Sequence, residues 1–192
     1  FPLPAGAKSR KIRPMSRFLT LTAVLATAAC AALAGGLNNA GFETGDFTGW
    51  QFFGQGWRIS NYGRDSHRGI WGAVNDIVTN NVADEYRVIV QETKVAEGKT
   101  YSCGAWVRTV CIEAAECFLE VQFLTKQGEV LSQHNSARLT NSQEFTYLSI
   151  SNMVAPERSA RAGIRGVVHV LGTPVQNTDF LIFDSFDFRA QR

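Results

Sequence analysis

The most constraining feature of the sequence is a series of short runs in which apolar and polar residues alternate, from residue 35 to the C-terminus. A period of two is typical of β-strands with one buried face. No apolar pattern of helical period in this region exceeds two turns, and turn residues such as those at 97–99 and 126–128 separate the runs. Seventeen glycines and many Phe and Val residues also favour strands over helices. The sequence therefore predicts an all-β domain.

Nine strands are expected, and this number and spacing in one domain favour an antiparallel β-sandwich. They lie at residues 57–60, 72–74, 86–95, 100–110, 117–125, 130–133, 145–152, 161–171 and 180–188.

Residues 1–34 differ in character from the rest of the chain. Residues 18–34 form an apolar run that follows basic residues and ends in Ala32-Leu33-Ala34, the small-x-small pattern of a signal-peptidase site. We expect an upstream segment plus a cleaved signal peptide over 1–34, and a single secreted domain over 35–192. That domain would be extracellular or periplasmic, with no membrane contact after cleavage. Two alternatives are a membrane anchor and a lipoprotein acylated at Cys30.

The charge of the chain is unevenly distributed. Five of the 19 basic side chains lie within residues 1–34, which contain no acid, so 14 basic face 17 acidic side chains in the remainder. A slightly acidic body without a basic stripe argues against nucleic acid as a partner.

Three cysteines follow the apolar run. Cys111 and Cys117 flank five residues between two apolar runs, so they are expected to form a disulfide across a hairpin mouth. Such a short loop contributes roughly 2 kcal/mol in the chain-entropy account of disulfides. Cys103 alternates with apolar residues and is predicted to be a buried free thiol.

One polar face of a sheet is the candidate binding surface. If the strands near residues 106, 120 and 167 share a sheet, their outward side chains line one surface, since alternate residues share a face. A flat ring can pack on the C–H face of a sugar while polar groups bind its hydroxyls. The predicted surface consists of Trp106, Arg108, Glu120, Gln122, Arg165 and His169, with Trp57 and Tyr62 as rim residues. The alternative is an ordinary solvated face on which a loop half covers Trp106.

Three segments resemble carbohydrate-binding modules of the family 4/9/22 type. Residues 39–50 read NAGFETGDFTGW and resemble the opening signature of these modules. Residues 95–101 (VAEGKTY) followed by 105–108 (AWVR) are similar to their central strand, and 180–186 (FLIFDSF) to their closing strand. The resemblance implies a galactose-binding-like jelly roll with a carbohydrate partner.

The same resemblance implies a structural Ca²⁺ between the opening segment and the last strand. Its ligands would be the Gly41 carbonyl and the Glu43 and Asp184 carboxylates, with Asp65 and the Arg68 carbonyl as further ligands. Ca²⁺ accepts such mixed sets of six to eight oxygen donors. The alternative is that these acids are solvated.

We therefore expect a secreted, non-catalytic module that binds a polysaccharide or glycan on one sheet face. The acids show no evident pairing of the kind that a glycosidase needs, and no nucleophile elbow or phosphate loop occurs. Two alternatives remain open at this point. One is an extracellular structural or adhesive subunit that self-assembles through its edges, and the other is a small glycan hydrolase on the same fold.

Overall fold

The computed structural model describes residues 36–77, 84–110, 112, 114–172 and 179–191. Every strand of the described residues lies in the contact-defined unit Ala32–Arg192. The strands are β1 (Gln51–Phe53), β2 (Trp57–Ser60), β3 (Gly72–Ile77), β4 (Glu85–Lys94), β5 (Thr100–Val110), β6 (Ala115–Leu124), β7 (Val130–Asn135), β8 (Gln143–Val154), β9 (Arg161–Val170) and β10 (Asp179–Ala190). None of the described residues forms a helix that could cross a membrane.

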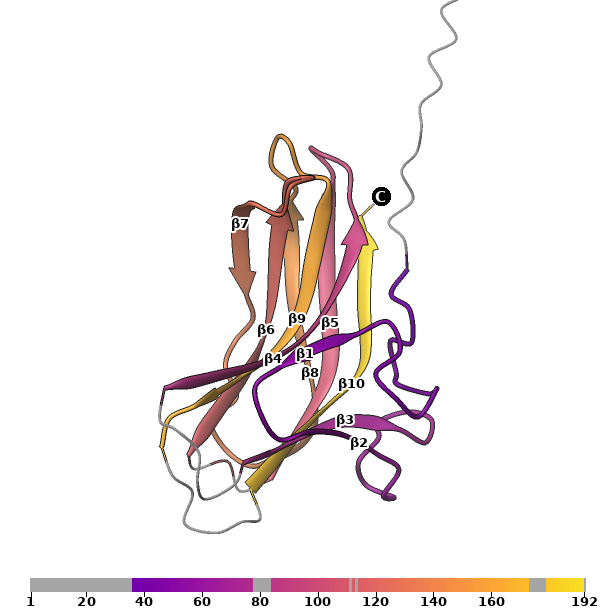
Figure 1. Cartoon of the computed structure of the whole chain (residues 1–192), viewed down its shortest axis with the longest axis vertical. Helices are drawn as coiled ribbons and strands as arrows, with labels where there is room; N and C mark the ends of the chain where they lie inside the picture. The colour runs from indigo at the N-terminus through magenta and orange to yellow at the C-terminus, as the bar shows by residue number, and fades with distance from the viewer. Residues whose placement is uncertain (1–35, 78–83, 111, 113, 173–178, 192) are drawn as a thin grey trace, which may run out of the picture. The chain divides into compact units, whose positions relative to one another are not determined.

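The strands form two antiparallel five-stranded sheets, which confirms the predicted β-sandwich (Figure 1). One sheet has the order β1-β4-β9-β6-β7 and the other β2-β3-β10-β5-β8. The nine expected strands are all present. The additional strand, β1, has only three residues, all exposed, and pairs with β4 at the sheet edge. A strand this short and this exposed carries no alternation from which it could be predicted.

The core between the sheets follows the predicted alternation. On β5, Tyr101, Cys103, Ala105 and Val107 are each at most 1% exposed and belong to one hydrophobic core. Inward-facing residues of β6, β9 and β10 pack against them. Burial of these apolar side chains is the main force that holds the two sheets together.

The opening segment, residues 36–50, packs beside the last strand. The Phe186 amide of β10 donates to the Ala40 carbonyl at 2.9 Å. The rings of Phe42 and Trp50 lie 6.2 and 4.7 Å from the Phe186 ring, and both side chains are buried. Two distant parts of the sequence are thereby joined, which positions the oxygen donors of both.

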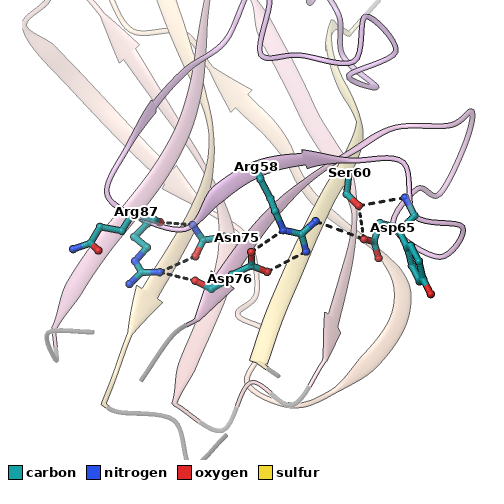
Figure 2. Close-up of polar contacts among 8 residues, drawn as sticks. Arg58, Ser60, Asp65, Asn75, Asp76 and Arg87 are labelled. Atoms are coloured by element: carbon teal, nitrogen blue, oxygen red, sulfur yellow. Dashed lines mark hydrogen bonds and ion pairs between the residues drawn. The ribbon is translucent and has the colours of Figure 1, made fainter. Parts of the chain in front are cut away.

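A chain of polar contacts crosses from one sheet to the other (Figure 2). The Arg87 guanidinium of β4 is fully buried and donates to Asn75 Oδ1 at 3.2 Å and to the Asp76 carbonyl at 3.0 Å, both on β3. The Asp76 carboxylate in turn binds Arg58 of β2, at 2.7 Å from Nε to Oδ2. A buried guanidinium needs such partners because an unpaired buried charge is costly.

Candidate functional site

The predicted single surface is divided between the two sheets. Trp106 and Arg108 lie on β5, whereas Glu120 and Gln122 lie on β6, in the opposite layer of the sandwich. The prediction that these side chains share one surface is therefore wrong. The chain crosses from one sheet to the other between β5 and β6, and alternation along a strand carries no information about which sheet the strand joins.

The β6 and β9 residues of the predicted set do meet, on the outer face of the sheet β1-β4-β9-β6-β7. Glu120 lies directly opposite Arg165 in the register and accepts a hydrogen bond from its Nη1 at 2.5 Å. The Gln122 amide donates to Glu120 Oε1 at 2.9 Å and to Gln133 Oε1 of β7 at 3.3 Å. This row of carboxylate, amide and guanidinium groups can donate to and accept from sugar hydroxyls.

His169 anchors the other end of this face. Its ring stacks on Tyr86 of β4 with centroids 4.1 Å apart and an angle of 6° between the planes. The ring nitrogens lie 2.9 Å from Glu116 Oε1 and 2.8 Å from Asp84 Oδ1. Arg138 also contacts Glu116. Because both imidazole nitrogens have acid partners, the His169 ring is fixed beside Tyr86.

Sequence analysis missed Tyr86, although it lies within the predicted strand 86–95 and alternates with inward-facing residues. It stands opposite His169 in the β4–β9 pair and is 51% exposed, so one face of its ring remains open. The outward periodicity of the strand was the available signal. The stacking partner could not be inferred without the register.

A hollow of about 430 Å³ opens on the same sheet, between β1, β4 and β9. It is lined by Gly49, Gln51, Val90, Gln91, Glu92 and Arg161. Arg161 and Glu92 form an ion pair at 2.5 Å. Ligand sites commonly have volumes of roughly 300–1,000 Å³, so the hollow is large enough for a sugar unit.

The outer face of the other sheet is more enclosed. The His67 ring stacks on Trp106 with centroids 3.9 Å apart, and Tyr147 of β8 packs nearby at 5.5 Å. A loop residue thus covers one face of the half-buried tryptophan, as the alternative interpretation of Trp106 expects. Arg108 is also covered, since it is 9% exposed and donates to the Arg64 carbonyl at 3.0 Å.

The two rim residues belong to this second sheet and its loops. Trp57 starts β2, packs against the core near Phe183 and donates from its indole nitrogen to the Phe53 carbonyl at 3.0 Å. Tyr62 follows β2 in a loop and is 80% exposed. Neither residue extends the row that contains Glu120 and Arg165.

The predicted calcium ligands are partly brought together around residues 67–71. Asp184 is fully buried, and its Oδ2 accepts from the amides of His67 at 2.7 Å and Arg68 at 3.0 Å. Gly41 is adjacent, because a Cβ built on it would lie 3.4 Å from Asp184 Oδ1.

Glu43 reaches the same loop from the opening segment. Its carboxylate accepts from the amides of Ile70 and Trp71 at 3.1 Å. A side chain at Gly69, where φ is +85°, would collide with this carboxylate at 2.4 Å. Glycine is therefore required for the loop to approach Glu43 so closely.

Asp65 does not join this group. Its carboxylate accepts from the Ser60 hydroxyl at 2.6 Å and lies 3.9 Å from Arg58 (Figure 2). It also lies 4.0 Å from Arg108. The prediction that the Asp65 side chain is a ligand together with Asp184 is therefore not supported. Its charge is already balanced by two arginines.

Asp184 and Glu43 are left as candidate calcium ligands, and both carboxylates already accept main-chain hydrogen bonds. Burial raises the pKa of Asp184, and within the described ranges no lysine or arginine forms an ion pair with Asp184 or Glu43. No three His, Cys, Asp or Glu side chains of the described residues are grouped so as to hold a metal by themselves. A cation here would need main-chain carbonyls in addition to the two carboxylates, and Ca²⁺ accepts that combination.

The cysteine predictions have different outcomes. Cys103 is a free thiol at 1% exposure, as expected, and burial raises its pKa to about 12. Cys117 is also a free, fully buried thiol, so the predicted disulfide between Cys111 and Cys117 is not seen. Cys111 lies outside the described residues. Cys117 faces the sandwich core from β6, and β5 and β6 lie in opposite sheets, so these strands do not form the hairpin across which the bridge was expected.

Comparison with known proteins identifies the fold. No family profile matches the chain, and no curated protein matches its sequence. Among solved structures, a family 61 carbohydrate-binding module in complex with β-1,4-galactotriose superposes with a TM-score of 0.58 at 20% identity, over 81% of this chain and 97% of that one. A second module from family 16 gives a TM-score of 0.57 at 17% identity, over 79% and 97% of the two chains.

Some similar structures also contain an enzyme. The family 22 module joined to a family 10 catalytic module in Clostridium thermocellum endo-1,4-β-D-xylanase 10B, complexed with xylohexaose, gives a TM-score of 0.57 at 18% identity. The match covers 82% of this chain but only 28% of the xylanase structure. The protein therefore has the galactose-binding-like jelly-roll fold of these carbohydrate-binding modules.

Proposed function

We propose that this protein is a secreted carbohydrate-binding module that binds a polysaccharide without cleaving it. The binding surface is the outer face of the sheet β1-β4-β9-β6-β7. The observation that carries the proposal is the open ring of Tyr86, held by His169 on the same sheet face as the hydrogen-bonding row of Glu120, Gln122 and Arg165. Export is supported by the apolar run over residues 18–34.

The chemistry of the face suits a sugar. The free face of Tyr86 can pack on the C–H face of one pyranose, while the polar row, four residues further along β9, exchanges hydrogen bonds with the hydroxyls of another sugar unit of the same polysaccharide. Acids on this face are already held by cations, Glu120 by Arg165 and Glu92 by Arg161. Such pairing suits recognition of hydroxyls better than the proton transfer of a glycosidase, which needs two free carboxyl groups on either side of one bond.

The similar structures support the same ligand class. Two of them are described as complexes with oligosaccharides, β-1,4-galactotriose and xylohexaose. Their folds match this chain at identities of only 20% and 18%. A shared fold does not determine which sugar is bound, so the sugar depends on the side chains of this chain.

A glycan array followed by affinity measurements tests this proposal. Tyr86→Ala is expected to weaken binding to the best glycan by about tenfold, which corresponds to ~1.4 kcal/mol. The matched control is Tyr62→Ala, which removes an even more exposed tyrosine from a loop of the other sheet. Equal losses in both variants, or no glycan bound at all, would contradict the proposal.

We also propose that a structural Ca²⁺ joins the opening segment to β10. Glu43 and Asp184 would supply carboxylates, and Gly41 and Arg68 would supply main-chain carbonyls. Bound calcium would balance the buried Asp184 charge and hold together two segments that are distant in sequence.

Calorimetry with and without a chelator tests the calcium proposal. Calcium at 100 times its dissociation constant should stabilise the folded protein by about 2.7 kcal/mol, so chelation should lower Tm. In Glu43→Gln the response should be much smaller, whereas Glu97→Gln, in a distant turn, should behave like the wild type. A wild-type melting curve that is unaffected by the chelator would remove calcium from the proposal.

A further inference from the structure

Three basic side chains line one hollow at the end of the proposed binding face where β4 and β6 end and β9 begins. Lys94 ends β4 and lies directly opposite Arg161, the first residue of β9. On the other side of β9, Arg161 pairs with Leu124 of β6, and Lys126 follows two residues later. Strand register therefore brings together cations from three separate segments.

These side chains line a second hollow of about 500 Å³, together with Val95, Ser159 and Ala160. Arg161 is paired with Glu92. Within the described part of the chain, no carboxylate forms an ion pair with Lys94 or Lys126. The hollow thus carries two uncompensated positive charges, although the body of the protein is slightly acidic.

Ser159, which lines the hollow, is a second observation at this place. The residue is 8% exposed, and its hydroxyl oxygen is buried with no hydrogen-bond partner among the described residues. Leaving a buried polar group unsatisfied costs roughly 1–3 kcal/mol. Rotation of this side chain into the hollow would let the hydroxyl donate to an anionic oxygen beside the cations.

The basic hollow continues the proposed binding face. Arg161 lines both this hollow and the hollow of about 430 Å³ that also contains Gln51 and Glu92. A polysaccharide that lies across β1, β4 and β9 would therefore extend to Lys94 and Lys126. The aliphatic stems of these lysines, with Val95, can contact a sugar ring while the ammonium groups reach an acidic substituent.

We propose that the preferred ligand is an acidic polysaccharide, and that one carboxylate or sulfate group of it binds in the hollow formed by Lys94, Lys126, Arg161 and Ser159. This inference rests on the proposed glycan-binding function and specifies its ligand class. Carboxylates and sulfates share the needed chemistry, since both present anionic oxygens to lysine and to a hydroxyl donor.

The test compares three soluble probes, polygalacturonate, a sulfated galactan and neutral β-1,4-galactan, against the full chain at physiological ionic strength. At least one acidic probe should bind about tenfold or more tightly than the neutral galactan. Lys94→Gln and Lys126→Gln should each weaken acidic binding by about three- to tenfold and leave neutral binding unchanged. The two acidic probes show whether a carboxylate or a sulfate is preferred.

Two further variants separate a built site from general charge attraction. Ser159→Ala keeps the charge and should still weaken acidic binding by about threefold. Arg64→Gln removes one exposed charge from a loop after β2 and should have no effect. Tm is measured for each variant so that a loss of folding is not mistaken for a loss of binding.

The possible failures are distinguishable. If neutral galactan binds best, or if Arg64→Gln weakens acidic binding as much as the lysine variants do, the acidic-ligand inference is overturned and glycan binding stands. If none of the probes and no glycan on an array binds, the proposed function and this inference fail together.

Discussion

At the scale of single residues, the outer face of β5 shows how a glycine makes room for the side chain of a neighbouring strand. The Tyr147 hydroxyl lies over Gly104, where a Cβ would approach it to 2.0 Å. From that position it donates to Asp187 Oδ2 of β10 at 2.6 Å. Glycine at 104 therefore allows a tyrosine of β8 to reach across β5 to β10.

Tyr147 provides a prediction about alkaline pH. Burial raises the pKa of its hydroxyl from 10.0 to about 12, and the hydrogen bond to Asp187 contributes to the shift. The folded state thus holds this proton more tightly than the unfolded state. The resulting stabilisation is complete below pH 10 and is lost as pH rises towards 12.

Urea unfolding of the wild type and of Tyr147→Phe between pH 7 and pH 11 measures this effect. The difference between their free energies of unfolding should be constant up to about pH 10 and should then decrease. A difference that stays constant up to pH 11 would mean that the hydroxyl pKa is the same in the folded and unfolded states.

At the scale of secondary-structure elements, the polar chain in Figure 2 connects strands of both sheets. Its centre is the side chain of Arg87, which is fully buried and donates to Asn75, the Asp76 carbonyl and Glu85. Sequence reasoning missed the buried Arg87 network. A charged residue in a predicted strand is expected to face solvent unless buried partners, here on β3, are known.

Arg87→Ala should lower the free energy of unfolding by about 3–5 kcal/mol, since it leaves buried partners without their donor. The control is Arg58→Ala in the same polar chain, where the side chain is 44% exposed. That change should cost about 1 kcal/mol or less because solvent screens the exposed pair. Similar costs for both variants in urea unfolding would show that burial does not control the strength of this network.

The strands also explain which predicted site residues lie where they were expected. Glu120 and Arg165 were expected to face outward, and they do, because period-two alternation is a local property of a strand. That they pair directly depends on the register between β6 and β9. Trp106 was assigned to the same surface, but its strand joined the other sheet.

At the scale of the whole molecule, the opening segment and β10 are joined through Trp50. Its indole is 6% exposed, contacts Phe42 and Phe186, and donates to the Asn39 carbonyl at 3.1 Å. This contact belongs to the same core as the two sheets. Trp50 is therefore expected to contribute to the stability of the entire domain.

Trp50→Ala should lower the free energy of unfolding by about 3–5 kcal/mol through lost burial and the cavity that remains. Phe53→Ala is the control, since Phe53 is 55% exposed and its replacement should change stability by about 0.5 kcal/mol or less. Chemical denaturation monitored by far-UV circular dichroism measures both. A small effect of Trp50→Ala would mean that the opening segment is not coupled to global unfolding.

The sequence by itself determined that the region after residue 35 is all-β, where nine of its strands run, and which apolar side chains of those strands face inward. These properties follow from alternation and turn residues, which act over a few positions. Only the tertiary structure decided that β5 and β6 lie in opposite sheets, that Tyr86 stacks on His169, and that Lys94 stands beside Arg161. Each of these depends on which strands pair and in what register, and that choice is made by packing between residues far apart in the chain.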